Sequence, residues 1–361
     1  ALTPGRPSVL GNLGVTLFHL RQWEAAIPVL GQATTADPSL ADAWACLGLA
    51  NAAQGQWPAA AAALAKALAL SPQQAPLWLS LGQVSLRLGR VENARQAFDR
   101  ALQEDPECAP AWSERGSLLR ELHQFEEAAR CFEKALALGG DPELNGYYLA
   151  SVRDGVAPAT PPRRYVEALF DDYAADFQSH LVEELGYRGF EELLQPLVDQ
   201  GKRYRHVLDL GCGTGLCGPL IAPQADTIDG VDVSSGMLEQ ARKLGVYREL
   251  IHADLGEFLA ATAMRPDLIV AADVFIYVGE LTTIFRSLRR ILEPGGCLAF
   301  TVELAEKGKH IQLLPSLRYA HSEAYIRRLA DEARFTGVRI FEAPIRRDQT
   351  APIMGLYVYL D

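Results

Sequence analysis

Short apolar runs alternate with helical stretches along the second half of the chain. From residue 206 onward, the runs have the length of buried strands, and the segments between them place apolar residues every three or four positions. The predicted strands cover residues 206–210, 227–232, 248–252, 267–272, 296–302, 337–342 and 353–360. This alternation predicts a parallel sheet with helices on both faces, ending in a hairpin. Residues 165–194 follow helical spacing and predict two helices before the first strand.

The first half of the chain repeats a pattern every 34 residues. Four series keep that step: Pro4, Pro38, Pro72 and Pro106; Trp44, Trp78 and Trp112; Gly14, Gly48, Gly82 and Gly116; Ala26, Ala60, Ala94 and Ala128. Small residues where two helices cross, large residues in the gaps and a proline after the second helix predict helical hairpins with the Trp and Ala series in their core. The predicted hairpins begin at Pro7, Ala41, Ala75 and Ala109.

The repeat array resembles tetratricopeptide repeats (TPR), and it predicts an all-α solenoid over residues 1–152. A capping helix at residues 143–152 closes the array, and a Pro-rich linker at residues 153–164 precedes the second domain, residues 165–361. Pro4 occupies the closing position of a repeat whose helices are missing, so we expect at least one more repeat upstream. The positions that face the groove of such an array are mainly apolar here, which favours an amphipathic or extended apolar partner segment.

The segment VLDLGCGTGLCG begins within the first predicted strand and continues into a glycine-rich turn. Gly211, Gly213 and Gly215 allow a tight turn and a close approach to a ligand. Asp209 lies just before them, where a carboxylate repels the pyrophosphate of a dinucleotide and attracts an ammonium or sulfonium group. The turn therefore favours S-adenosylmethionine over NAD, although it also contains the GxGxxG spacing of dinucleotide-binding proteins.

With the later segments TIDGVDVSSGML, LIHADL, DLIVAADVFIYV and LEPGG, the turn resembles the class I S-adenosylmethionine-dependent methyltransferases. The resemblance implies a Rossmann-like, seven-stranded α/β domain that binds the cofactor beyond the C-terminal ends of its strands. Asp232 is then expected to bind the ribose, Val233 and Met237 to enclose the adenine, and Asp254 to accept from the adenine amino group or to cap a helix. Helices before the first strand would form a lid. The cofactor-binding candidates are Asp209, Gly211, Gly213, Gly215, Asp232, Val233, Met237, Asp254, Leu255, Asp273 and the lid residues Tyr173, Phe177 and His180.

The acceptor pocket is predicted from residues that follow strand ends or lie between the fifth and sixth strands: Asp273, Tyr277, Glu303, His310 and His321. The segment RYAHS around His321 resembles a recurring segment of repeat-linked methyltransferases. We predict that His321 acts as general base or acceptor anchor, with a surface or capping role as the alternative. Tyr277 is the second catalytic candidate, with a core position as its alternative. The segment AADVFIY lacks the Asn/Asp-Pro-Pro-aromatic motif of enzymes that methylate amides or base amines, so DNA methylation is disfavoured.

Composition narrows the choice of partners and compartment. The net charge of -11 and the pI near 5.2 disfavour nucleic acid, which requires a basic face. No apolar run reaches the roughly 18 residues of a membrane span. The six cysteines include no CxxC pair, which indicates a reduced, cytoplasmic protein without a metal site.

Together these features predict a cytoplasmic methyltransferase whose repeats recruit or orient the acceptor, a protein, a peptide or a carrier-bound intermediate. One alternative is a small-molecule O-methyltransferase whose repeats form a homodimer. Another is a scaffold that binds S-adenosylmethionine without turnover.

Overall fold

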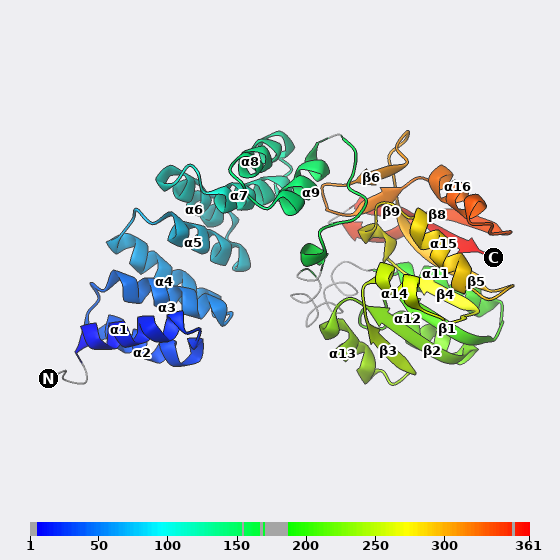
Figure 1. Cartoon of the computed structure of the whole chain (residues 1–361), viewed down its shortest axis with the longest axis horizontal. Helices are drawn as coiled ribbons and strands as arrows, with labels where there is room; N and C mark the ends of the chain where they lie inside the picture. Colours follow the sequence, from blue (N-terminus) through cyan, green and yellow to red (C-terminus); the bar gives the residue numbers. More distant parts are fainter. Residues whose placement is uncertain (1–5, 154, 167–168, 170–186, 349–350) are drawn as a thin grey trace. The chain divides into compact units, whose positions relative to one another are not determined.

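The computed structural model describes residues 6–153, 155–166, 169, 187–348 and 351–361 (Figure 1). The chain divides into two compact units, residues 1–153 and residues 154–361. Each unit has apolar clusters of its own. In the part of the chain that is described, no helix is long and apolar enough to cross a membrane.

The first unit is a row of helical hairpins, as the repeats predict. The hairpins pair α1 (Pro7–His19) with α2 (Trp23–Ala36), α3 (Ala41–Ala53) with α4 (Trp57–Leu70), α5 (Ala75–Arg87) with α6 (Val91–Glu104), and α7 (Ala109–Glu121) with α8 (Phe125–Ala137) (Figure 1). A last helix, α9 (Pro142–Val152), packs on α8. Asp141 caps it by accepting hydrogen bonds from the N–H groups of Glu143 and Leu144, both at 3.0 Å.

The glycine series marks the crossing of the two helices in each hairpin. A Cβ added at Gly82 would lie 2.3 Å from the ring of Phe98, and one at Gly116 would lie 2.6 Å from the ring of Phe132. In the first two hairpins leucines take the place of the phenylalanines. In each hairpin, a large side chain of the second helix thus packs against a glycine of the first helix, and this contact recurs every 34 residues.

The tryptophan series has a role beyond packing. The indole N–H groups of Trp44, Trp78 and Trp112 donate to the carbonyl oxygens of the prolines six residues earlier, at 3.0, 2.7 and 2.9 Å. Their side chains are half-buried and pack against the apolar clusters of the repeats. Each indole hydrogen-bonds the turn that precedes its own helix, which explains why Pro and Trp share one spacing.

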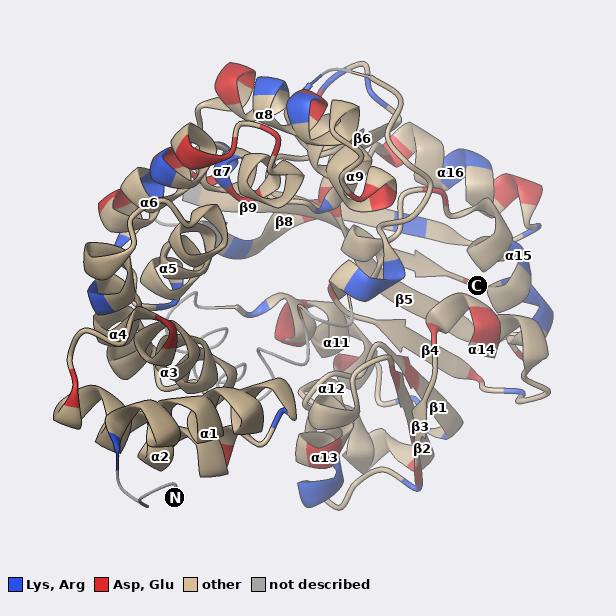
Figure 2. Ribbon diagram, turned by 60° about the vertical axis from the view of Figure 1, so that its left-hand side comes forward, with Lys and Arg blue, Asp and Glu red and all other residues tan. Residues whose placement is uncertain are grey.

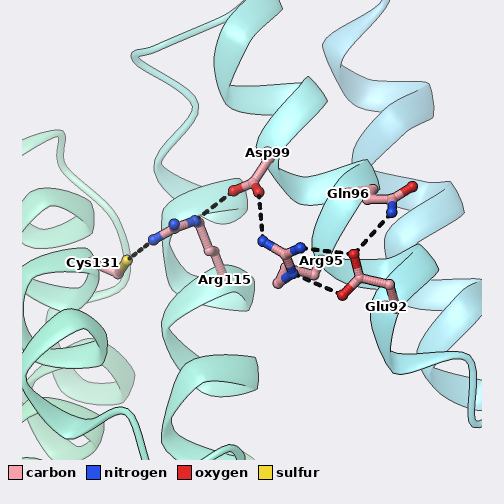
Figure 3. Close-up of polar contacts among 6 residues, drawn as sticks. All are labelled: Glu92, Arg95, Gln96, Asp99, Arg115 and Cys131. Carbon is pink, nitrogen blue, oxygen red and sulfur yellow. Dashed lines mark hydrogen bonds and ion pairs between the residues drawn. The ribbon is translucent and has the colours of Figure 1, made fainter.

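Charged residues are sparse on α3 and α4 and frequent on α6 and α8 (Figure 2). Part of this charge links the third and fourth hairpins (Figure 3). Asp99 on α6 accepts a hydrogen bond from Arg115 Nε on α7 at 2.8 Å, and Arg95 Nη1 lies 3.7 Å from the same carboxylate. Arg115 also donates to Cys131 Sγ on α8 at 3.1 Å. One guanidinium thus joins three successive helices.

The second unit is built on a mixed sheet. Its strands are β1 (Tyr204–Leu210), β2 (Ala225–Asp232), β3 (Glu249–His252), β4 (Leu268–Ala271), β5 (Cys297–Leu304), β6 (Ile311–Leu313), β7 (Tyr319–His321), β8 (Val338–Asp348) and β9 (Ala351–Leu360). The order β3-β2-β1-β4-β5 is parallel throughout, and β9 lies antiparallel between β5 and β8. The sequence predicts seven of the nine strands, namely β1 to β5, β8 and β9.

The hairpin of β6 and β7 is the part of the sheet that the sequence analysis missed. Glu303 and Leu304, at the end of β5, pair with Ala320 and His321 of β7, and β6 runs antiparallel to β7. Each strand is three residues long, which is too short for an alternating pattern to be recognised. The hairpin extends the sheet at the C-terminal end of β5.

Helices cover both faces of the sheet. On one face, α14 (Leu255–Ala261), α15 (Thr282–Ile291) and α16 (Glu323–Glu332) pack against Leu208, Ile269 and Phe300. On the other, α11 (Gly189–Asp199) and α12 (Cys217–Ile221) pack against Val207, Leu268 and Ala299. Because neighbouring residues of a strand point to opposite faces, continuous apolar runs fill both cores. The predicted fold class is confirmed.

Candidate active site

A pocket of about 660 Å³ opens in the second unit where β1, β2, β3 and β4 end. Residues that follow each strand line it: Gly211 to Thr214 after β1, Asp232 and Val233 at the end of β2, Ala253 to Glu257 after β3, and Ala272 to Val274 after β4. From β1 the chain forms β2 and β3 on one side of this strand, and it then crosses to form β4 on the other side. The pocket therefore lies where the strand order reverses. Ligands of parallel α/β sheets bind at this position.

Two glycines shape the wall of the pocket after β1. Gly211 and Gly213 adopt φ values of 60° and 54°, which favour glycine. A Cβ on Gly211 would also lie 2.6 Å from the side chain of Val274, which lines the same pocket. The N–H of Gly213 donates to Asp232 Oδ2 at 2.8 Å, so the turn is tied to the end of β2.

Asp232 is the acid at the centre of this pocket wall. Its Oδ1 accepts a hydrogen bond from the N–H of Ser234 at 2.9 Å, and its side chain is almost fully buried. Burial raises the pKa of Asp232, while the hydrogen bonds from Ser234 and Gly213 act against that rise. A carboxylate oxygen has lone pairs left after one such bond, so Asp232 can accept further hydrogen bonds from a ligand.

The helices after β2 and β3 place the next group of lining residues. Ser234 caps α13 (Ser235–Lys243) by accepting from the N–H of Met237, whose side chain lines the pocket. Asp254 caps α14 through Oδ1, which accepts from the N–H of Glu257 at 3.0 Å. Asp254 and Leu255 line the pocket as well, so Asp254 both caps a helix and faces the cavity.

Asp209 is not among the described residues that line the pocket, and neither is Gly215. The Asp209 side chain is buried, and its Oδ2 accepts a hydrogen bond from the hydroxyl of Tyr247 at 2.7 Å. Burial raises the pKa of Asp209 to about 7, against the lowering effect of the Tyr247 hydrogen bond. The sequence predicts that Asp209 faces the methionine ammonium directly or through water; in the structure its carboxylate lies behind the pocket wall, with one oxygen bound by Tyr247.

A buried charged network lies beside the end of β4. Arg346, on β8, donates to Asp273 Oδ2 at 2.6 Å and to Glu303 Oε1 on β5. Asp273 has a φ of 61°, and its N–H donates to the hydroxyl of Thr301 at 2.8 Å. Burial raises the pKa of Glu303, and the charge of Arg346 opposes that rise. Asp273 lines the pocket, and its partner Arg346 lies 73 positions away in the sequence, where no local pattern links the two.

Three polar atoms of the pocket wall have no hydrogen-bond partner among the described residues. They are the hydroxyls of Thr214 and Tyr187 and Oδ1 of Asp273, all buried. Buried polar atoms in proteins are almost always paired, so atoms of this kind on a cavity wall indicate a polar ligand or ordered water.

His321 does not reach the pocket. Its ring is fully buried, Nε2–H donates to the carbonyl of Gly279 at 2.9 Å, and the ring stacks on Tyr325 with centroids 5.6 Å apart. Burial lowers the pKa of His321 to about 4. This placement corrects the expectation of a general base at His321 and gives the residue a role in fixing the β6–β7 hairpin. His310 is exposed.

The other acceptor-pocket candidates divide in a simple way. Tyr277 lines the pocket, whereas Glu303 is not among its described lining residues and pairs with Arg346. Arg318, from the segment RYAHS, lines the pocket and was not among the predicted residues, although its segment was. The candidate lid residues Tyr173, Phe177 and His180 lie outside the described residues.

The segment predicted as a linker also contributes to the pocket. Thr160, Pro161 and Arg163 line it. The carbonyl of Ala159 accepts hydrogen bonds from the N–H groups of Gly279 and Glu280, both at 3.0 Å. These contacts agree with the division of the chain at residue 153, which places this segment in the second unit.

Comparison with known proteins supports both halves of the prediction. The methyltransferase domain family matches residues 207–296, and tetratricopeptide repeat families match residues 12–75, 51–114 and 109–141. A malonyl-[acyl-carrier protein] O-methyltransferase of Legionella pneumophila is 33% identical over 45% of this chain and 58% of its own length. A trans-aconitate 2-methyltransferase of Acidovorax ebreus is 37% identical over 31% of this chain and 46% of its own length.

This chain thus spans less than two thirds of either relative. Among solved structures, the magnesium protoporphyrin IX methyltransferase of Synechocystis, with bound S-adenosylhomocysteine, matches with a TM-score of 0.44 and 18% identity over 55% of this chain and 98% of its own. The chain joins tetratricopeptide repeats to a domain of the methyltransferase family, as the sequence predicts.

Proposed function

We propose that this chain is an S-adenosylmethionine-dependent methyltransferase whose repeats recruit the acceptor, a protein, a peptide or a carrier-bound compound. The observation that carries the proposal is the pocket at the strand ends, in which Asp232 faces the cavity beside a turn of bare glycine backbone. A carboxylate at the end of the second strand suits the two hydroxyls of a ribose.

The described residues fit an adenosyl ligand. Asp232 would hold the ribose, Met237 and Val233 would contact the adenine ring, and Asp254 lies where it can accept from an amino group. The unpaired hydroxyl of Thr214 provides a donor or acceptor on the glycine turn. When bound, S-adenosylmethionine supplies a methyl group on a positively charged sulfur. The contribution of the protein is to orient this group and the acceptor atom in line.

Two observations support an acceptor that is carried by a protein. The Legionella relative is named for malonyl-[acyl-carrier protein], an acyl group on a carrier protein. Tetratricopeptide repeats bind protein segments, and such repeats precede the methyltransferase domain here.

All six cysteines are free, which fits a reducing cytoplasm. The trans-aconitate relative supports the alternative of a small-molecule acceptor.

Calorimetric titration with S-adenosylmethionine, S-adenosylhomocysteine and NAD tests the cofactor. We expect the two adenosyl ligands to bind and NAD to fail, and Asp232→Ala to weaken binding roughly 10- to 100-fold through the loss of charge-assisted hydrogen bonds. Asp226→Ala is the matched control, because Asp226 is an exposed acid at the other end of β2. Equal affinity in the Asp232 variant and in the wild type would refute the assignment.

Recruitment by the repeats is tested with one acyl group in two forms. Malonyl-acyl-carrier protein and malonyl-pantetheine present the same reacting atoms with and without a protein carrier. Recruitment predicts a kcat/KM about 10-fold or more higher for the protein-bound form, which corresponds to about 1.4 kcal/mol of additional binding. Equal values for the two forms would favour the small-molecule alternative.

A further inference from the structure

Arg318 stands out on the pocket wall because the turn that presents it is unusual. It follows Leu317, a buried residue with a φ of 62°, in the connection between β6 and β7. The N–H of Leu314 donates to the carbonyl of Arg318, and that of Leu317 to the carbonyl of Leu314, both at 2.8 Å. A non-glycine residue in this conformation costs about 1 kcal/mol or more, so the surrounding structure holds the turn in place.

The acids near Arg318 are paired with a different guanidinium. Asp273 and Glu303 both receive hydrogen bonds from Arg346, which is buried on β8. Arg318 is partly buried and lines the pocket, and its guanidinium forms no ion pair or hydrogen bond with any residue that the structure describes. Its donors therefore remain available on the wall of the cavity.

The pocket that Arg318 lines has a largely apolar wall. Val274, Val278 and Ile284 line the same pocket, as do Leu216 and Phe190. A guanidinium on the wall of such a pocket binds a carboxylate with two parallel hydrogen bonds, because its N–H groups match the two oxygens. An acceptor that combines an apolar stem with a carboxylate has the complementary chemistry.

We propose that Arg318 binds the carboxylate of the acceptor and that the enzyme forms a carboxylic acid methyl ester. This inference rests on the proposed function. A lone pair of the carboxylate oxygen forms the new O–C bond while the C–S bond of the donor breaks, and the electron pair of that bond stays on sulfur. The products are a methyl ester and S-adenosylhomocysteine. A carboxylate is already ionised at neutral pH, so the step releases no proton and needs no general base.

The experiment uses three probes with the same apolar stem: octanoate, 1-octanol and octylamine. Each is titrated into the full chain saturated with S-adenosylhomocysteine, for the wild type, for Arg318→Met and for Arg286→Met. Arg286 is an exposed arginine on α15 and serves as the matched control. Methyl octanoate formed from octanoate and S-adenosylmethionine is measured in parallel by mass spectrometry.

We expect octanoate to bind more tightly than the other two probes, and Arg318→Met to weaken octanoate binding roughly 10- to 100-fold without change for 1-octanol. S-adenosylhomocysteine affinity should be the same in all three proteins. Octanoate binding that is no tighter than octanol binding, or that is unchanged in Arg318→Met, would overturn the inference. Loss of S-adenosylhomocysteine affinity in Arg318→Met would also overturn it, because Arg318 would then bind the cofactor. A wild type that binds no S-adenosylhomocysteine would instead refute the proposed function.

Discussion

Replacing Arg346 by methionine tests whether its two ion pairs hold the second unit together. The Arg346 side chain is 1% exposed, and its partners Asp273 and Glu303 are 15% and 3% exposed. Removing one partner of a buried pair leaves an uncompensated charge, which costs about 3 to 5 kcal/mol. For a unit of this size, that loss lowers the unfolding temperature by roughly 6 to 20 °C.

The stability lost in Arg346→Met should increase as the pH rises. Burial raises the pKa of Glu303 and Arg346 lowers it, so the variant raises this pKa further. A carboxyl group whose pKa is higher in the folded state than in the unfolded state loses stability as the pH rises. The deficit of Arg346→Met is therefore expected to be largest near pH 8 and to shrink toward pH 5, and the double variant with Glu303→Gln should recover part of it.

The assay can separate the two units, because all five tryptophans lie between residues 23 and 112. Tryptophan fluorescence thus follows the repeats, and calorimetry records both units. We expect Arg346→Met to shift only the calorimetric transition that fluorescence does not report. Arg328→Met, which removes an exposed pair with Glu332, is the control and should change little. An unshifted transition near pH 8, or a deficit that is constant with pH, would refute the reasoning.

Two further changes test features of each unit. Asp209→Asn should raise the stability of the ligand-free second unit near pH 8 and make that stability less dependent on pH between about pH 4 and 7. Burial raises the pKa of Asp209 to about 7, so ionisation of this carboxyl group opposes folding in the wild type. Calorimetry across this pH range measures the effect, and a pH slope equal to that of the wild type would contradict it. Gly82→Ala should destabilise the repeats by about 1 to 3 kcal/mol, since its Cβ would lie 2.3 Å from Phe98. Gly146→Ala, in an open position of α9, should stabilise them by about 0.5 to 1 kcal/mol. The fluorescence transition measures both glycine variants, and shifts of the same sign would refute the packing argument.

The fold could be predicted because its determinants are local and repeated. A glycine such as Gly82 recurs with the step of the hairpin, and strand residues such as Val207 and Leu208 are apolar because both faces of the sheet are covered. Because each predicted strand has a defined C-terminal end, the residues that follow these ends could also be named from the sequence. They include Asp232 and Met237, which line the pocket.

The details of the site depend on contacts between distant segments, which one sequence does not encode in a readable form. Tyr247 reaches Asp209 across 38 positions, and Arg346 reaches Asp273 across 73. The segment RYAHS was identified as important, but its strand is too short to show which side chain faces the cavity. The turn at Leu317 places Arg318 there and leaves His321 in the core.

The position of β9 has a consequence for the order in which the chain acquires structure during synthesis. Every hairpin of the repeats is made from contiguous residues, so each can form soon after it leaves the ribosome. The strand β9 instead inserts between β5 and β8, both of which are synthesised before it. Until β9 emerges, β5 lacks the neighbour with which Leu298 to Glu303 pair, and its apolar edge stays open. The repeats are therefore expected to be complete while the sheet is still exposed to chaperones.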